Sequence, residues 1–243
     1  MVWDNQQATS WFCGILEGEG SFHIRKSGSV RIQLHNNDKD IIDECEKFLL
    51  SLNLIVGVYP VKAGKKIGYK ICIPDLESKS LYPRIYQQME CRRNEYQRML
   101  GASETTCDPT VDLYWLIGMF EAEGCFFISQ NHRGHFTPRI ELDNTNRTII
   151  KKIVATLSVH NCAWHCKDYV PTIKQEYTKL SIPGMLRVRR FLSETKGLWR
   201  SSRNIKRTNL MLEYINSRLE TPNNTPYNNR EKQIYYEIKQ LNS

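Results

Sequence analysis

Two glutamates, Glu17 and Glu19, lie where an apolar helix is expected to end, in the stretch WFCGILEGEGSF. A helix C-terminus already presents unpaired carbonyl oxygens and the negative end of the helix dipole, so carboxylates there are disfavoured unless a cation compensates them. The pattern returns in WLIGMFEAEGCF as Glu121 and Glu123, and a shift of 104 residues gives seven identities over positions 11 to 24. One copy would be a solvated surface helix end, but its duplication indicates a paired site.

The second acid of each pair is the candidate metal ligand. Each expected helix carries two small residues four positions apart, which would let the helices pack closely: Gly14 and Gly18, then Gly118 and Ala122. Such packing would bring Glu19 and Glu123 together beside helix-end carbonyls. An all-oxygen site of this charge raises a carboxylate pKa or binds a hard divalent cation such as Mg²⁺. Glu17 and Glu121 lie roughly 200° around their helices, so we expect them to be structural.

Capping residues suggest where the two motif helices begin and end. Thr9 or Ser10 is the expected N-cap of the first helix, which would run to Glu19. Gly20 would end it in the left-handed conformation. Asp108 followed by Pro109 is expected to open the second helix.

Alternating patterns after each motif predict antiparallel hairpins. In SFHIRKSGSVRIQLHN, apolar residues alternate with polar or basic ones around a turn at Ser27 and Gly28. The second repeat alternates in the same way, and helical spacing returns near 41–52 and 149–157. A second hairpin and another helix follow in each half. Each repeat therefore reads αββαββα, an α+β lobe with one antiparallel sheet.

The repeat spacing divides the chain into two pseudo-symmetric lobes of about 100 residues. The stretch GASETTCDPT at 101–110 predicts a linker between them. The expected divisions are 1–100 for the first lobe, 101–110 for the linker, 111–221 for the second lobe and 222–243 for a partly helical tail.

Composition indicates a folded protein of a reducing, intracellular setting. The chain has 243 residues, of which 40% are hydrophobic, and neither a secretory signal nor a membrane span is visible. Its eight cysteines mostly have apolar neighbours, which favours buried thiols over a disulfide framework. The stretch HNCAWHC resembles half a zinc site, but core packing explains it better because no second ligand pair has the required spacing.

The net charge of +8 is unevenly distributed. Between Met185 and Leu210, eight basic residues stand against the single acid Glu194. We name this segment the basic stretch. A solvated helix is one explanation, but bases around an exposed Trp199 fit phosphate contacts better. The candidates for those contacts are Arg200, Arg203 and Arg207.

The doubled motif resembles that of the two-motif, single-chain LAGLIDADG homing endonucleases, with glutamate in place of each aspartate. The resemblance covers almost the whole chain and implies two lobes packed through the motif helices, with both sheets forming a saddle that binds double-stranded DNA. It implies a monomer that hydrolyses phosphodiester bonds with two or three Mg²⁺ ions shared between the acids. The implied metal ligands are Glu19 and Glu123, with the main-chain carbonyls of Gly18 and Ala122.

The resemblance also implies further site residues. A polar residue at the end of the second strand of each lobe orients water and metal, and Asn36 and Asn144 align there. A basic residue near each scissile phosphate completes the set, and Lys70 and Lys179 align across the repeats. A solvated strand lysine is the alternative for both. The mechanism implied is attack of metal-activated water on each phosphodiester, without a covalent enzyme intermediate.

Polar side chains of the strands are the candidates for contacts with bases or phosphates in the major groove. They are His23, Arg25, Arg31, Gln33, Lys62 and Lys66 in the first lobe, and Arg139, Glu141 and Lys174 in the second. Because the two lobes carry different residues, the target is expected to be long and non-palindromic.

Two other functions compete with this hypothesis. An intron-splicing maturase of the same fold would bind intron RNA, with or without cleavage, and a basic surface serves either nucleic acid. The presence of both acids favours retained cleavage. A His-Asn nuclease is suggested only by LHNND, which lacks a following metal-binding helix. The expected setting is an organelle, either a mitochondrion or a chloroplast, or a bacterium or phage.

Overall fold

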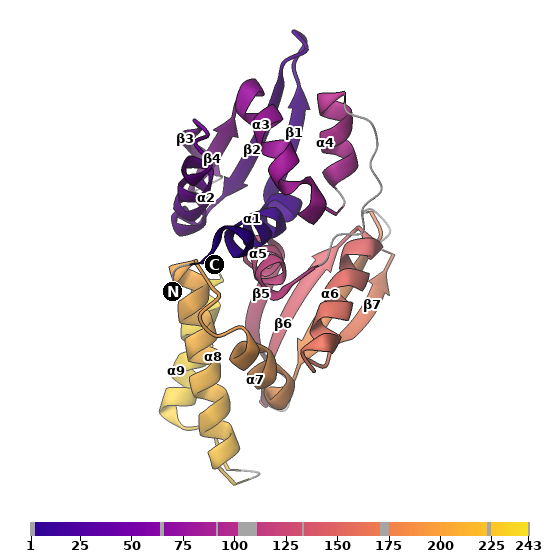
Figure 1. The fold of residues 1–243 in the computed structure, drawn as a ribbon. Helices are drawn as coiled ribbons and strands as arrows, with labels where there is room; N and C mark the ends of the chain where they lie inside the picture. The colour runs from indigo at the N-terminus through magenta and orange to yellow at the C-terminus, as the bar shows by residue number, and fades with distance from the viewer. Residues whose placement is uncertain are drawn as a thin grey trace. The chain divides into compact units, whose positions relative to one another are not determined.

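A computed structural model describes residues 3–63, 66–90, 92–101, 111–132, 134–170, 175–222 and 225–242 (Figure 1). The side chains of residues 63 and 66 also lie outside this description. By their contacts the residues form two compact units, Met1–Glu123 and Gly124–Ser243. Packing therefore groups the second motif helix with the first unit. Within the described ranges, no helix combines the length and apolar character needed to span a membrane.

The first unit contains one antiparallel sheet in the strand order β1-β2-β4-β3. Its apolar face is covered by helices, among them α2 and α3 (Figure 1). The elements in order are α1 (Asn5–Glu19), β1 (Gly20–Ile24), β2 (Val30–Asn36), α2 (Lys39–Ser51), β3 (Gly57–Ala63), β4 (Lys66–Ile73), α3 (Asp75–Ile85), the short 3₁₀ helix η1 (Tyr86–Gln88), α4 (Arg92–Leu100) and α5 (Leu113–Glu123).

The second unit repeats this plan with the strand order β5-β6-β8-β7. Its elements are β5 (Gly124–Gln130), β6 (Phe136–Asn144), α6 (Arg147–Val159), β7 (His165–Tyr169), β8 (Tyr177–Pro183), α7 (Met185–Glu194), α8 (Ser202–Glu220) and α9 (Asn229–Leu241). Both α8 and α9 pack on the edge strand β5. The predicted α+β order αββαββα is thus confirmed for both repeats.

The strand register explains the alternating sequence pattern. Ile32 lies opposite Phe22 on β1 and opposite Ile73 on β4, and all three belong to the apolar side of the sheet. Arg31 and Gln33, on either side of Ile32, project from the other face. At the hairpin turn, Gly28 has a φ of 81°, a left-handed conformation that glycine adopts without strain. The predicted hairpin is confirmed.

α1 ends at Glu19 as expected, but its N-cap and the backbone of Gly20 differ from those expected. Asp4 is its N-cap and forms a capping box with Gln7. The expected caps Thr9 and Ser10 lie inside the helix, where the Thr9 hydroxyl donates to the Asn5 carbonyl and the Ser10 hydroxyl donates to Asp112. Gly20 has an extended backbone with a φ of −72°, since α1 passes directly into β1. The expected opening of the second helix at Asp108 and Pro109 lies outside the described residues.

The first unit is built around a very close crossing of α1 and α5, which lie against each other in Figure 1. A β-carbon built on Gly14 would lie 2.2 Å from the carbonyl oxygen of Trp115. One built on Gly118 would lie 2.2 Å from the carbonyl oxygen of Trp11. Backbone therefore packs directly on backbone, as the spacing of small residues predicts.

Replacing Gly118 with alanine is expected to destabilise the protein by roughly 1 to 3 kcal/mol, because the methyl group overlaps a backbone oxygen that cannot rotate away. Urea unfolding followed by circular dichroism measures the loss. Gly28→Asn is the control for a side chain added without a clash: its built β-carbon meets nothing within 4 Å, so it adds only the strain of a positive φ, which asparagine keeps small. Equal stability of Gly118→Ala and the wild type would contradict the close crossing.

Candidate active site

Glu19 and Glu123 are the last residues of α1 and α5, and each helix is followed directly by a strand. The two helix ends adjoin within the first unit. A β-carbon built on Gly18 would lie 2.5 Å from the Ala122 β-carbon and 3.7 Å from Oε1 of Glu123. The small residues one position before each acid therefore let the carboxylates converge, as expected from the sequence.

The two carboxyl groups are partly buried and lie near each other, and both effects disfavour their charged forms. Burial, and then the charge of Glu123, raise the pKa of Glu19 from 4.5 to about 7. Burial also raises the pKa of Glu123. The guanidinium of Arg92 opposes both shifts. Near neutral pH the site thus holds negative charge that an additional cation would stabilise.

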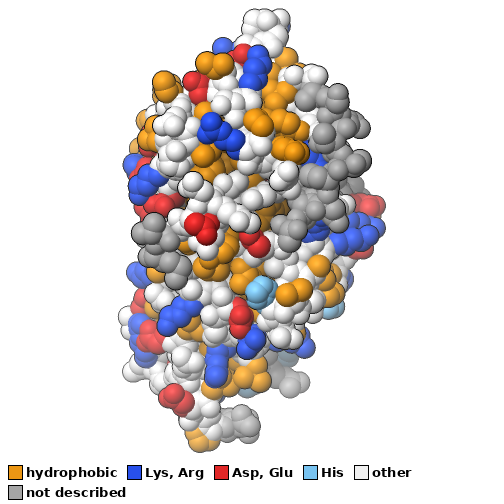
Figure 2. Space-filling model, viewed as in Figure 1, with side chains coloured by type: hydrophobic (Ala, Val, Ile, Leu, Met, Phe, Trp, Pro, Cys, Tyr) orange, Lys and Arg blue, Asp and Glu red, His pale blue; other side chains and the backbone are white. Residues whose placement is uncertain are grey.

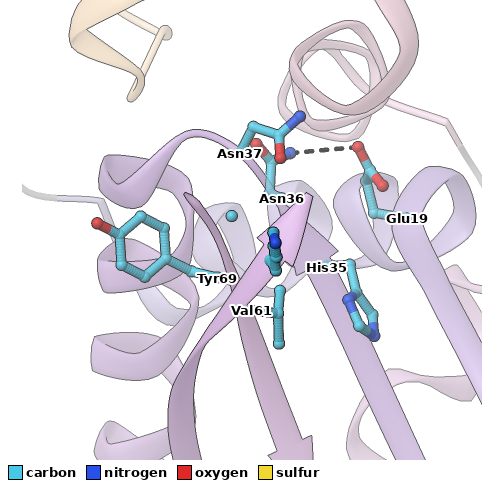
Figure 3. A pocket seen from close by; sticks show the side chains of 8 residues that line it. Glu19, His35, Asn36, Asn37, Val61 and Tyr69 are labelled. Atoms are coloured by element: carbon cyan, nitrogen blue, oxygen red, sulfur yellow. Dashed lines mark hydrogen bonds between the residues drawn. The ribbon is translucent and has the colours of Figure 1, made fainter. Parts of the chain in front are cut away.

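A pocket of about 290 Å³ opens beside Glu19 in the first unit (Figure 3). Nδ2 of Asn36 donates a hydrogen bond of 3.3 Å to Oε1 of Glu19. Oδ1 of Asn36 accepts from the backbone N–H of Asp38 at 2.7 Å, which fixes the orientation of the amide. The structure therefore joins the predicted Glu19, Asn36 and Lys62 in one place. The remaining lining residues are His35, Asn37, Val61, Gly68 and Tyr69.

Asn144 has the same local conformation in the second unit. It ends β6 as Asn36 ends β2. Its Oδ1 accepts from the backbone N–H of Asn146 at 2.7 Å, the counterpart of the Asn36–Asp38 bond. The repeat thus preserves this turn along with the residue type.

The two predicted lysines occupy equivalent strand positions but have different neighbours. Lys70 on β4 lies opposite His35 on β2. Lys179 on β8 lies opposite Asp143 on β6, and its Nζ is 3.0 Å from Oε2 of Glu141. Glu141, expected to contact DNA, is therefore already paired with Lys179.

The other predicted contact residues lie mostly on the polar strand faces. His23 is opposite Arg31 and is exposed, as are Arg25 and Lys62. Arg139 on β6 lies 3.8 Å from Glu141. The Lys66 side chain and Lys174 are outside the described residues. The face drawn in Figure 2 intersperses Lys and Arg with Asp and Glu side chains.

The basic stretch contributes less to the surface than expected. Trp199 is only 5% exposed and packs edge-on against Phe126, so the expectation of an exposed tryptophan is wrong. Arg207 is 6% exposed, and it donates to Oδ1 of Asn204 and to the carbonyl of Leu241. Its guanidinium joins α8 to the end of α9, which removes it from the candidate phosphate contacts. Arg200 and Arg203 are half-buried, with partners inside the protein.

Glu17 and Glu121 have structural roles, as expected from their position on the other side of their helices. The carboxylate of Glu17 accepts from the backbone N–H groups of Glu90 and Arg92. Glu121 accepts from the indole of Trp11 at 2.8 Å across the helix crossing. Both glutamates are 4% exposed. They anchor the motif helices while leaving the neighbouring acids of the pair available.

Sequence reasoning missed Arg92 and His35. Nε of Arg92 donates to the backbone carbonyl of Glu17 at 2.9 Å, near the C-terminus of α1. This contact joins segments 75 residues apart, so no local pattern marks it. His35 could have been found, because it lies on the polar side of the predicted strand and comes directly before Asn36 in the sequence. Over the described ranges, groups of three or more His, Cys, Asp or Glu suited to a metal ion are absent, so a cation at the acid pair would also need carbonyl, phosphate or water oxygens.

Comparisons with known proteins relate the chain to a protein family and to solved structures. Residues 6–100 match the family model of the LAGLIDADG-like domain. Among the curated proteins, none matches the sequence. Several solved structures match nearly the full length, and their low identities mean that the likeness is one of fold.

Three of the matching structures, each described as bound to DNA, illustrate the likeness. The I-LtrWI LAGLIDADG homing endonuclease bound to target DNA has a TM-score of 0.65, with 14% identity and 98% of each chain covered. I-SmaMI bound to uncleaved DNA in the presence of calcium ions has a TM-score of 0.57, with 14% identity over 96% of this chain and 97% of that one. I-AabMI bound to uncleaved DNA also has a TM-score of 0.57, with 14% identity over 96% of this chain and 97% of that one. Residues 6–100 thus resemble the LAGLIDADG-like domain, and the whole chain has the fold of the two-domain LAGLIDADG meganucleases.

The pKa of Glu19 predicts a pH effect on stability. The folded value of about 7 exceeds the ordinary value of 4.5, so the folded state binds the proton more tightly. The stabilisation is complete below pH 4.5 and is lost as the pH rises to about 7. Without divalent ions, wild-type stability should therefore fall across this range relative to Glu19→Gln in chemical unfolding. Parallel profiles of the two proteins would contradict the coupled acid pair.

The hydrogen bonds of Glu17 predict a different effect. Glu17→Gln should destabilise the protein by about 1 to 3 kcal/mol, because the amide cannot accept from both backbone N–H groups and buries a donor facing them. Urea unfolding provides the measurement, and Glu46→Gln on the half-exposed side of α2 is the control. An unchanged free energy of unfolding in Glu17→Gln would contradict this structural role.

Proposed function

We propose that this protein is a site-specific homing endonuclease that cuts both strands of a long DNA target by metal-dependent phosphodiester hydrolysis. The observation that carries the proposal is the convergence of Glu19 and Glu123 at the adjoining ends of α1 and α5. Burial raises the pKa of both carboxyl groups. A pair held at this energetic cost is well suited to hold divalent cations, which recover that cost on binding.

The donor chemistry fits Mg²⁺. The carboxylates of Glu19 and Glu123 and the carbonyl oxygens of Gly18 and Ala122 would hold two or three ions, since this cation prefers oxygen ligands. When bound, Mg²⁺ supplies water activation and neutralises charge developing on the phosphate. The calcium ions present with DNA-bound I-SmaMI support a divalent cation in this fold.

The surrounding side chains would orient the reactants. The Asn36 amide bonds both Glu19 and the Asp38 backbone, so it holds the carboxylate and can position a water molecule next to it. Asn144 has the same backbone anchor and would serve the second repeat. Lys70 and Lys179 would each place an ammonium near one phosphate, where it stabilises the negative charge of the transition state.

The polar strand faces would read the target. Their residues differ between the repeats: His23 and Arg25 correspond to Phe127 and Ser129, and Gln33 corresponds to Glu141. Different side chains select different bases, so the two half-sites would differ and the target would be non-palindromic. Because the chain supplies both motif helices, the active species is proposed to be a monomer.

The proposal extends to the biological role. Intron homing in an organelle, a bacterium or a phage would suit a reducing setting, and Cys13, Cys45 and Cys162 are free thiols in the protein interior. A maturase that binds intron RNA is the competing function. Tight binding of structured intron RNA without cleavage of any DNA would support the maturase instead.

Cleavage of a plasmid library with random inserts tests the proposal. The wild type should linearise a small subset of plasmids with Mg²⁺ and none with EDTA, and sequencing of the ends gives the target. On that target, Glu19→Gln or Glu123→Gln should slow cleavage by about 100-fold or more, since each removes a carboxylate that neutralises transition-state charge. Binding measured with Ca²⁺ should stay within about threefold, because many other contacts provide affinity.

Glu220→Gln, at the exposed end of α8, is the control for loss of one negative charge. It should cleave like the wild type. Undiminished cleavage by either Glu19→Gln or Glu123→Gln would refute the assignment of the acid pair.

A further inference from the structure

Arg92 binds the C-terminal end of α1, the helix that ends in Glu19. Its Nε donates to the backbone carbonyl of Glu17 at 2.9 Å, two residues before the end of the helix. Its guanidinium carbon lies 5.9 Å from the centre of the Phe22 ring on β1. A cation at this end of a helix is favoured by the helix dipole and by the unpaired carbonyl oxygens. The backbone of α1 therefore holds the positive charge of Arg92 close to the end of the helix.

The charge of Arg92 acts on both members of the acid pair, Glu19 and Glu123. It opposes the rise in pKa that burial causes at each of them. All three residues belong to the first unit. Arg92 also lies 3.3 Å from Glu95, but the side chain of Glu95 is 50% exposed, and ion pairs in contact with water are weak. Arg92 thus supplies part of the positive charge that a metal cation would bring to the acid pair.

A fixed positive charge beside a metal site has two opposite effects. Without metal, it offsets the repulsion between the two carboxylates and so stabilises the adjoining helix ends. When a divalent cation approaches, the same charge repels that cation and lowers the affinity of the carboxylates for it. One arginine therefore sets the balance between a stable metal-free site and a tightly held ion.

We propose that Arg92 is a built-in counter-ion that keeps Glu19 and Glu123 together in the metal-free protein and holds their affinity for divalent cations low. The inference rests on the proposed function, which assigns the metal to these two acids. Arg92 is a positioning residue, since its contact is with the end of α1. The free protein would then bind the ions loosely, and phosphate oxygens of the DNA would be needed to complete their set of ligands.

Binding of Mn²⁺ to the free protein tests the affinity, with the unbound ion measured by electron paramagnetic resonance. Mn²⁺ is the probe because it prefers the same oxygen ligands as Mg²⁺. Arg92→Gln should bind Mn²⁺ about tenfold more tightly than the wild type, because one nearby positive charge is removed. Arg92→Lys keeps the charge and should stay within about threefold of the wild type. A merely structural arginine would instead leave the affinity of Arg92→Gln unchanged or lower it.

Arg84→Gln is the matched control. Nη1 of Arg84 donates to the carbonyl of Leu52, the C-cap of α2, at 2.7 Å. This arginine therefore also binds the end of a helix, but α2 has no acid in its last turn. Its replacement removes the same charge and the same kind of hydrogen bond, and it should leave the Mn²⁺ affinity unchanged.

Urea unfolding without metal, at a pH above the Glu19 pKa of about 7, tests the effect on the metal-free protein. Arg92→Gln should lower the free energy of unfolding more in the wild type than in Glu19→Gln, where the repulsion between the acids is already removed. Arg84→Gln should lower it equally in both backgrounds. An equal effect of Arg92→Gln in the two backgrounds would contradict the counter-ion role.

The outcomes separate this inference from the endonuclease assignment. Three results would overturn the role of Arg92 and leave that assignment intact: unchanged or weaker Mn²⁺ binding by folded Arg92→Gln, equal tightening by Arg92→Lys, or no binding by the wild type and Arg92→Gln alike. Wild-type binding of Mn²⁺ that neither Glu19→Gln nor Glu123→Gln reduces would overturn the acid pair as the metal site. The proposed metal-dependent function would then fail together with this inference.

Discussion

The crossing of α1 and α5 leaves no space for a β-carbon at Gly14 or Gly118, and the rest of the site depends on this constraint. Helices that cross with larger side chains between them stand farther apart. Here each backbone meets a carbonyl oxygen of the other helix, and the indole of Trp11 donates to Glu121 across the crossing. The direct contact carries on to Gly18 and Ala122, which delivers Glu19 and Glu123 to adjoining positions.

That packing creates an electrostatic problem at the helix ends. Two carboxylates, two helix C-termini and partial burial all favour positive charge. Arg92 supplies part of it by binding the Glu17 carbonyl and lowering the pKa of both acids against the effect of burial. Since the pKa of Glu19 is still raised to about 7, this compensation is incomplete. A divalent cation would complete it, which connects the duplicated motif to hydrolytic chemistry.

Much of this arrangement could be predicted from sequence because it is local or repeated. Alternation of apolar and polar residues predicted that Phe22 and Ile32 share one face of the hairpin, where the sheet pairs them. Small residues four positions apart predicted the helix faces that meet at Gly14 and Gly118. Contacts between distant segments could not be predicted. Ser10, an expected cap, lies inside α1, and its hydroxyl donates to Asp112 on a segment 102 residues away. The prediction for the basic stretch failed for the same reason. Trp199 is buried against Phe126 on β5, and Arg207 is buried against the end of α9, and neither contact is visible in the local sequence.

Anomalous diffraction from Mn²⁺ in crystals of the protein with its DNA target tests the central claim most directly. Manganese prefers the same oxygen ligands as magnesium and can be located by its scattering. We expect anomalous peaks about 2.0 to 2.3 Å from carboxylate oxygens of both Glu19 and Glu123. Peaks confined to other groups, with both carboxylates free of metal in a complex that holds the scissile phosphates, would contradict the account.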